Sequence, residues 1–268
     1  MTTARQEQRL VREIAREWGQ NAAERCRQLA NGLDFSHDSV LVPTILQLAG
    51  TLRGKKVIDV GCGCGFLTEA ASRTAASVLG VDISHEMITH ARRRFGKRPN
   101  LSFEATSIQE RAGMTKPVFD VCLANMSLML MPSLDSALVS MRSILKPGGR
   151  LVFSIPHPCT WNTFRRDEPS ESFDYWESHA VVAPFRITLD PKPLPVASTF
   201  FHRALGKYVE ALVGAGFRIE SLIEPNAPRN SPPKYLKGFS YPRFAVFSVV
   251  ANMFDRERRP RRHSNGLS

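Results

Sequence analysis

A glycine-rich loop that follows an acidic residue is the segment of this sequence best suited to chemistry. In VIDVGCGCG, Asp59 precedes Gly61, Gly63 and Gly65, which stand at alternate positions. Small residues at this spacing let the backbone turn sharply from a strand into a helix and let a ligand lie against bare peptide. The amide groups at the start of the following helix would point at that ligand. We therefore expect the loop to bind a small molecule.

A second acid, Asp82 in GVDIS, ends the next predicted strand 21 positions after Gly61. At this separation a doubly wound fold places a carboxylate against a ribose diol. A dinucleotide fingerprint would have its third glycine at position 66, which is Phe66 here, and Asp59 would repel a pyrophosphate but attract a cation. A ligand with a ribose, an adenine and a cationic amino-acid end fits both acids, and S-adenosylmethionine is such a ligand.

The elements around this loop alternate from Lys56 to Ile155, with short β-branched runs separated by helical periods of about a dozen residues. Near-continuous apolar strands joined by helices predict a parallel sheet covered on both faces, which is a doubly wound α/β fold. The expected strands are 57–60, 77–81, 101–104, 118–124 and 150–155, and the expected helices are 67–74, 84–95 and 133–145. Two later strands, 218–224 and 244–252, bring the predicted sheet to seven and leave it mostly parallel.

The rest of the chain divides into segments with different patterns. Amphipathic and apolar helical stretches up to about residue 27 and over 40–52 predict an N-terminal helical cap. A segment rich in proline and aromatic residues predicts a folded lid inserted over the strand ends. The expected units are a cap at 1–55, the α/β core at 56–155, the lid at 156–203, a helix (205–213) with the last two strands at 204–254, and a disordered basic tail at 255–268.

Composition and charge exclude several classes of protein. The chain has 268 residues, 43% of them hydrophobic and 23% charged, which is typical of a globular protein. No apolar run is long enough to span a membrane, and no apolar leader is visible, so we expect a cytoplasmic protein with no membrane partner. The net charge is +11, but part of it lies in the tail and the remainder is spread along the chain, which argues against a nucleic-acid partner.

The cysteines show no spacing typical of a metal site. They are Cys26, Cys62, Cys64, Cys122 and Cys159, and the odd count without a leader fits a reducing cytoplasm. We expect no metal, and we expect Cys62 and Cys64 to be small loop residues rather than nucleophiles.

Four segments in order, VIDVGCGCG, GVDIS, FDVCLANMSL and LKPGGRLVFSIPHP, resemble the class I S-adenosylmethionine-dependent methyltransferases. The resemblance spans about 56–158, and FHRALGKYVEALVGAGFRIESLIEP is similar to the C-terminal part of a bacterial small-molecule subgroup. The resemblance implies a Rossmann-like methyltransferase fold and S-adenosylmethionine as the cofactor.

The resemblance also implies which residues contact the cofactor. Asp59 and the glycine loop would hold its methionine end, Asp82 the ribose hydroxyls, and Asn125 would border the methyl group. Ser107 stands where many relatives have an aspartate that binds the adenine amino group. The implied set is Asp59, Gly61, Cys62, Gly63, Gly65, Asp82, Ile83, Met87, Ser107, Ile108 and Asn125.

Candidates for catalysis and for acceptor binding lie outside the loop. His157 follows the fifth predicted strand at the edge where such sheets bind ligands, and it could accept a proton, although a loop histidine fixed by the neighbouring prolines fits equally well. His202 is the second candidate base, and with Arg203 it could orient an acidic or phenolic substrate. The expected acceptor pocket also includes Trp18, Met129, Tyr175 and Trp176.

Three functions follow from these observations. The first is methyl transfer to an oxygen, nitrogen or carbon atom of a small, largely apolar molecule in a dry pocket. The second keeps the reaction but takes RNA or a carrier-bound acyl chain as acceptor, because the tail and the first helix are rich in arginine. The third is a cofactor-binding cyclase or another non-methylating protein, suggested by Ser107 and by the lack of histidine at 128–130.

Overall fold

A seven-stranded sheet organises the computed structural model, which describes residues 4–160, 173–190, 192–237 and 241–252. Its strands are β1 (Lys56–Val60), β2 (Ser77–Asp82), β3 (Leu101–Ala105), β4 (Phe119–Asn125), β5 (Leu145–Pro156), β8 (Phe217–Ile223) and β9 (Phe244–Ala251). Their order is β3-β2-β1-β4-β5-β9-β8. The first five strands pair in parallel, and β9 is antiparallel to both β5 and β8. The predicted doubly wound, mostly parallel sheet of seven strands is confirmed.

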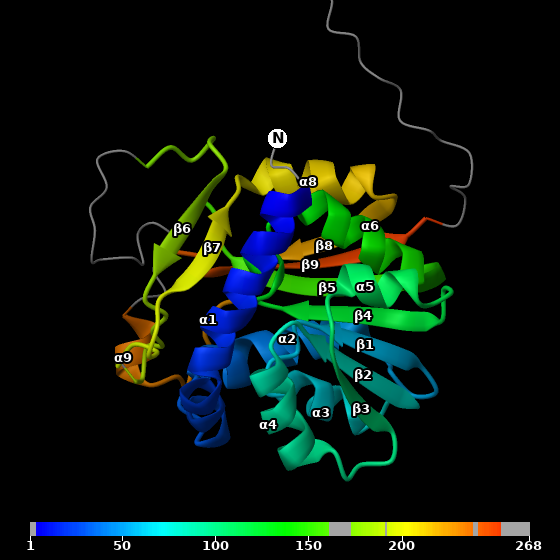
Figure 1. Ribbon diagram of the computed structural model, residues 1–268. Coiled ribbons are helices and arrows are strands. Elements are labelled where there is room, and N and C mark those ends of the chain that lie inside the picture. Colours follow the sequence, from blue (N-terminus) through cyan, green and yellow to red (C-terminus); the bar gives the residue numbers. More distant parts are fainter. Residues whose placement is uncertain (1–3, 161–172, 191, 238–240, 253–268) are drawn as a thin grey trace, which may run out of the picture.

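Helices cover both faces of this sheet (Figure 1). One face carries α2 (Val42–Ala49), α3 (Phe66–Ser72) and α4 (His85–Phe95), and the other carries α5 (Ile108–Gly113), α6 (Leu134–Ile144) and α8 (Leu205–Gly214). Alternation along β1 supplies both layers, because Ile58 belongs to one apolar cluster and Val57 to the other. Each such buried side chain contributes about 1.5–3 kcal/mol to folding, which explains why the strands read as unbroken apolar runs.

Local side-chain caps explain where several helices begin. Ser84 Oγ accepts a hydrogen bond from Met87 N at the start of α4, and Ser133 does the same for α6. Ser107 and Glu110 form a capping box at the start of α5, a helix that the periodicity did not predict. The strand expected at 150–155 starts earlier than predicted, because β5 already begins at Leu145 and pairs with β4 through a register shift.

The segment before the sheet is helical throughout most of its length. α1 (Ala4–Ala30) is followed by a π-helix, η1 (Ser36–Leu41), which leads directly into α2. A 3₁₀ turn, η2 (Leu128–Leu130), follows β4, and α9 (Pro233–Leu236) interrupts the long connection between β8 and β9. No helix in the described ranges is long and apolar enough to cross a bilayer.

A two-stranded hairpin, β6 (His179–Ala183) and β7 (Ser198–His202), stands apart from the main sheet beside α1 (Figure 1). Two polar residues of α1 bind it: Asn21 Nδ2 donates to Val196 O at 3.0 Å, and Glu17 Oε2 accepts from Thr199 N at 2.8 Å. The hairpin lies within the predicted lid, whose boundaries, like those of the cap, stay predictions. The basic tail at 255–268 lies outside the described residues.

A disulfide joins the N-terminal helix to the glycine loop. Cys26 on α1 and Cys64 are bonded, with their Cα atoms 5.7 Å apart. Our expectation that Cys64 is merely a small loop residue was therefore wrong. The two cysteines are 38 positions apart, so their pairing depends on how α1 packs and could not be seen in the local spacing.

Candidate functional site

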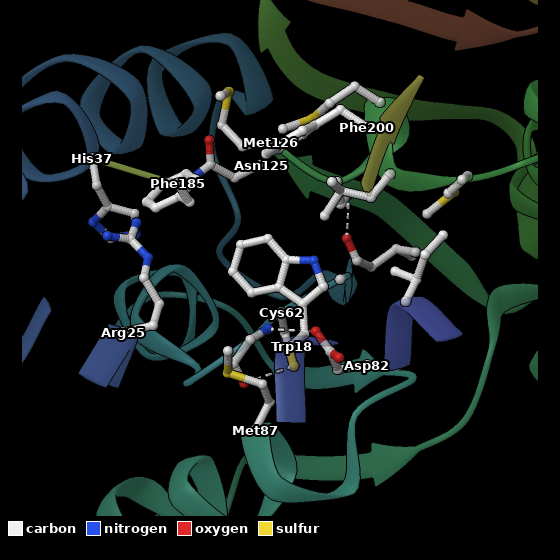
Figure 2. Close-up of a pocket in the computed structure, with 18 of the residues that line it drawn as sticks. Trp18, Arg25, His37, Cys62, Asp82, Met87, Asn125, Met126, Phe185 and Phe200 are labelled. Atoms are coloured by element: carbon white, nitrogen blue, oxygen red, sulfur yellow. Dashed lines mark hydrogen bonds between the residues drawn. The ribbon is translucent and has the colours of Figure 1, made fainter. Parts of the chain in front are cut away.

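A cavity of about 930 Å³ opens at the carboxyl ends of β1, β2 and β4. Its size is at the upper end of the range for small-molecule sites. We call the part formed by Asp59–Cys64, Asp82, Ile83, Met87 and Thr106–Gln109 the glycine-loop end. We call the part formed by Arg25, Asp34, His37, Met126, Met129, Phe185, Phe200 and Arg243 the hairpin end. Trp18 lies between the labelled side chains of the two ends in Figure 2.

The glycine loop has a backbone that tolerates no side chain at its first glycine. Gly61 has a φ of 71°, and a Cβ placed there would lie 2.4 Å from the Cβ of Ser127. Ser127 is itself fixed, because its Oγ donates to Val60 O at 2.8 Å. The loop therefore presents bare backbone to the cavity, as a ligand cradle requires.

Asp82 is held at the end of β2 by two backbone donors. Its Oδ2 accepts from Gly63 N at 2.9 Å, and its Oδ1 accepts from Ser84 N at 2.8 Å. Burial raises the pKa of this carboxyl, while the two N–H donors oppose that rise. The group is thus oriented by the loop and keeps further lone pairs that could accept hydrogen bonds from a ligand.

Asp59 lies deeper, with 1% of its surface exposed, and its Oδ2 accepts from Thr68 Oγ1 at 2.7 Å. Burial raises the pKa of Asp59 to about 7, against the stabilising hydrogen bond from Thr68 and with a further contribution from Asp82. Burial and the same two acids raise the pKa of the Cys62 thiol well above its ordinary value. Cys62 therefore stays a neutral thiol, and a cationic ligand would stabilise the ionised form of Asp59.

The remaining predicted cofactor residues lie around these acids. Ile83, Met87, Ser107, Ile108 and Asn125 all line the cavity, whereas Gly65 does not. Ser107 Oγ donates to Glu110 Oε2 at 3.0 Å and accepts from Glu110 N at 3.1 Å, so the capping box already engages this hydroxyl.

The hairpin end is walled by aromatic and methionine side chains. The rings of Trp18 and Phe185 meet edge to face with centroids 5.8 Å apart, and Met129 packs with Phe200. Met126 adopts a φ of 54°, a strained conformation for a residue with a side chain. Its N–H donates to Ser154 O at 3.1 Å and to Ser154 Oγ at 3.0 Å, which holds the tip of β4 in place.

Polar groups at the hairpin end come from segments that the sequence did not single out. Arg25 and Asp34 form a partly buried ion pair at 2.6 Å, and His37 Nδ1 lies 2.7 Å from Asp38 Oδ1. Arg243 lines the same wall, where burial lowers the pKa of its guanidinium. The adjacent His and Asp in NGLDFSHD were a visible signal, but the segment reads as a turn and gave no reason to expect a cavity wall.

Several predicted residues are not brought into this cavity. Their partners lie elsewhere: His157 Nε2 is 2.8 Å from Glu224 Oε1, His202 Nε2 is 2.9 Å from Tyr175 O, and Arg203 Nη2 donates to Met131 O at 2.6 Å. Trp176 is 78% exposed. Neither Tyr175 nor Trp176 lines the cavity, whereas Trp18 and Met129 do. For His157 the reason is alternation at the end of β5, because Pro156 lines the cavity and the next side chain is buried against Glu224.

Comparisons with known proteins give consistent results. Residues 52–182 match the family described as "Methyltransferase domain". A ubiquinone biosynthesis O-methyltransferase from Alkalilimnicola ehrlichii is 32% identical over 111 residues, which are 41% of this chain and 45% of that protein. The chain thus spans less than half the length of this curated relative.

Two solved structures extend the likeness over most of the chain. A protein from Listeria monocytogenes, described as a candidate S-adenosylmethionine-dependent methyltransferase, is 25% identical with a TM-score of 0.65, over 79% of this chain and 95% of that one. The N-methyltransferase NodS from Bradyrhizobium japonicum, solved with S-adenosylhomocysteine, is 15% identical with a TM-score of 0.51, over 78% of this chain and 85% of that one. At 15% identity the second likeness concerns the fold alone.

Proposed function

We propose that this chain, whose residues 52–182 form a methyltransferase domain of the class I S-adenosylmethionine-dependent family, transfers a methyl group from that cofactor to an oxygen atom of a small, largely apolar molecule. The observation that carries the proposal is one continuous cavity, with the buried Asp59, the half-buried Asp82 and bare backbone at one end and aromatic walls at the other. The name of the O-methyltransferase relative supports oxygen over nitrogen or carbon as the acceptor atom.

The glycine-loop end fits the cofactor. Asp82 has lone pairs for the ribose hydroxyls, and the buried carboxyl of Asp59 suits the cationic methionine end. Gly61 carries no side chain, and a Cβ there would meet Ser127, so the methionine end of the cofactor could approach the backbone closely. When bound, the cofactor supplies a methyl group on a positively charged sulfur.

The hairpin end would position the acceptor. Its apolar walls exclude water, and alignment of two reactants in such a cavity lowers the barrier by up to about 7–11 kcal/mol. Trp18 Nε1 is buried and has no hydrogen-bond partner among the described residues, so it is available to an oxygen of a bound ligand. The rigid tip of β4, with Asn125 and Met126, lies where the two ends meet and would border the methyl group.

Calorimetric titration with S-adenosylhomocysteine tests the cofactor half of the proposal. The wild type should bind, and Asp82→Ala should bind about 30-fold more weakly, because charge-assisted hydrogen bonds of about 2 kcal/mol are lost. Asp135→Ala is the matched control, since Asp135 is exposed on α6 and does not line the cavity. Folded wild type that does not bind S-adenosylhomocysteine would overturn the proposal.

Transfer of a labelled methyl group tests the acceptor half. The wild type is incubated with labelled S-adenosylmethionine and separate panels of small hydroxylated aromatics, amines and carbon nucleophiles. We expect label in an ether product. Label on nitrogen or carbon would change the acceptor atom, and an isomerised substrate with intact cofactor would support a cyclase instead.

A further inference from the structure

A chain of polar contacts lies on the cavity wall at the hairpin end, with Asp34 and His37 buried and Asp38 exposed. Arg25 Nη2 is 2.6 Å from Asp34 Oδ2, and Asp34 Oδ1 accepts from the backbone N–H of His37 at 3.1 Å. The ring of His37 continues the chain, with Nδ1 2.7 Å from Asp38 Oδ1. Arg25, Asp34 and His37 all line the cavity (Figure 2 labels Arg25 and His37). The contacts thus tie α1 to η1 at a point where both face the ligand space.

The contact with Asp38 determines which ring nitrogen of His37 carries the proton. A carboxylate can only accept a hydrogen bond, so Nδ1 is the donor and Nε2 of the neutral ring keeps its lone pair. The backbone N–H of His37 is also held, by its hydrogen bond to Asp34. Contacts with two acids therefore fix both the backbone and the ring of this residue. His37 is 9% exposed and lines the cavity, and it therefore brings a proton-accepting atom to this wall.

Two acids and one arginine lie along the chain of contacts that includes His37. With a neutral ring, Arg25 contributes +1 and Asp34 and Asp38 contribute −1 each, which leaves −1. The carboxylate of Asp38 lies directly against the ring of His37. Arg186 and Arg243 also line the cavity, and the described hydrogen bonds of His37 are to Asp34 and Asp38.

The position of His37 also distinguishes it from the other histidines. His157 and His202 are engaged with Glu224 and with Tyr175 O, and neither lines the cavity. His37 is the one histidine among the described residues that line it. It lies on the π-helix η1, a form that costs regular hydrogen bonding and is frequent at functional sites.

We infer that His37 is the general base of the proposed methyl transfer, that Asp38 is its positioning residue, and that the acceptor is a small molecule with an acidic hydroxyl group such as a phenol. This inference rests on the proposed function. The acceptor oxygen forms the new O–C bond while the sulfur keeps the electron pair of the broken S–C bond. Nε2 of His37 takes the hydroxyl proton, Nδ1 keeps its bond to Asp38, and the proton is later released to water.

A general base on the cavity wall favours hydroxyl acceptors over amines. An oxygen must lose its proton as it attacks the methyl group, whereas a neutral amine can attack with its own lone pair. A base on the cavity wall therefore matters most for hydroxyl acceptors, and it matters less as the hydroxyl becomes more acidic. The aromatic wall of Trp18 and Phe185 beside His37 suits a planar phenolic ring.

Kinetics with two phenols of different acidity test the role of the base. With catechol, His37→Ala and His37→Gln should lower kcat about 100-fold or more, and Asp38→Asn about 10-fold, with S-adenosylhomocysteine affinity unchanged within about twofold. With 4-nitrocatechol, which ionises more readily, the loss in His37→Ala should shrink to about 10-fold or less. His90→Ala is the matched control, since His90 lies on α4 outside the cavity and should leave kcat unchanged.

A second measurement determines which ring nitrogen of His37 carries the proton, and it requires no turnover. Nitrogen NMR of the wild type labelled at histidine should show neutral His37 with its proton on Nδ1 and a bare Nε2. Asp38→Asn should remove this preference. Thermal unfolding and S-adenosylhomocysteine binding show that each variant is folded.

The outcomes separate the inference from the function on which it rests. A wild type that transfers no methyl group to any hydroxylated acceptor overturns both. A wild type that methylates phenols while His37→Ala retains its kcat overturns the inference alone, and so does a loss equal for both phenols. A proton found on Nε2 of His37 also overturns it.

Discussion

The two ends of the cavity are built in different ways. Most of the glycine-loop end comes from one stretch of chain, β1, the loop, β2 and the start of α4, between Asp59 and Met87. The hairpin end combines α1, η1, the tip of β4, the hairpin and the start of β9, so that Arg25 and Arg243 share one cavity. A motif within 30 residues can be recognised from sequence, whereas a wall assembled across more than 200 residues exists only in the folded chain.

The ends also differ in charge. The glycine-loop end holds two acids, the buried Asp59 and the half-buried Asp82, and suits a cation. The hairpin end carries Arg25, His37 and Arg243 among apolar walls, with Asp34 as the ion-pair partner of Arg25. A cationic cofactor and an acceptor that develops negative charge on oxygen would each be drawn to its own end, which favours the alignment that transfer requires.

The largest predicted effect concerns the disulfide that joins α1 to the glycine loop. Cys26→Ser should lower the free energy of unfolding by about 3–4 kcal/mol, because the loop of 38 residues closed by the bond no longer restricts the unfolded chain. Urea denaturation measures this, and Cys159→Ser is the control because Cys159 is free and exposed. S-adenosylhomocysteine affinity should change less than threefold. Equal stability of the two variants would show that α1 and the glycine loop are not covalently joined.

The next effect tests the backbone of the glycine-loop end. Gly61→Ala should weaken S-adenosylhomocysteine binding about 30-fold or more, since the new Cβ would meet Ser127 at 2.4 Å in a left-handed backbone. Gly148→Ala isolates the contribution of the backbone, because Gly148 has a φ of 73° and a Cβ placed there would meet no atom within 4 Å. That control should cost about 1–2 kcal/mol of stability and leave affinity unchanged. Similar affinities for the two variants would contradict a cradle at Gly61.

A third effect should appear only at the hairpin end. Phe185→Ala should raise the acceptor KM about tenfold, because a ring that packs against Trp18 and Arg25 is lost, while S-adenosylhomocysteine affinity stays the same. Trp176→Ala serves as the control, since this ring is 78% exposed and outside the cavity. Steady-state kinetics and calorimetry separate the two quantities. An equal loss of cofactor affinity in Phe185→Ala would mean that the ends are not distinct sites.

The smallest effect is a pH dependence at the glycine-loop end. Asp59, with a pKa of about 7, is mostly neutral at pH 6 and ionised at pH 8, so cofactor affinity should rise about threefold to tenfold across this range. Calorimetry at several pH values measures the rise, and Asp59→Asn should remove it. The stability of the ligand-free protein should change in the opposite direction. Because the pKa of Asp59 is raised by folding, the folded protein binds more protons than the unfolded chain between about pH 4 and 7. The free energy of unfolding therefore falls as pH rises through this range.

The features that could be predicted from the sequence are those encoded in short, local patterns. The alternation of apolar strands and helices was sufficient for the seven-stranded sheet, and Asp59 and Asp82 could be placed at one edge because parallel strands end there. His157 shows the limit, since a shift of one residue at the end of β5 decides whether a side chain lines the cavity. His37 and the Cys26–Cys64 pair could not be found because α1 and η1 reach the loop only through long-range packing.

The bond between Cys26 and Cys64 has a mechanical consequence for the passage of ligands. While it is intact, the Cα atoms of the two residues stay near 5.7 Å apart, so this part of α1 cannot lift away from the floor of the cavity. Any movement of α1 that widens the cavity would therefore leave Cys26 in place. The N-terminal portion of α1 and the β6–β7 hairpin are joined by the hydrogen bonds of Glu17 and Asn21. Reduction of the disulfide should therefore free Cys26 from the loop while these hydrogen bonds still hold α1 against the hairpin.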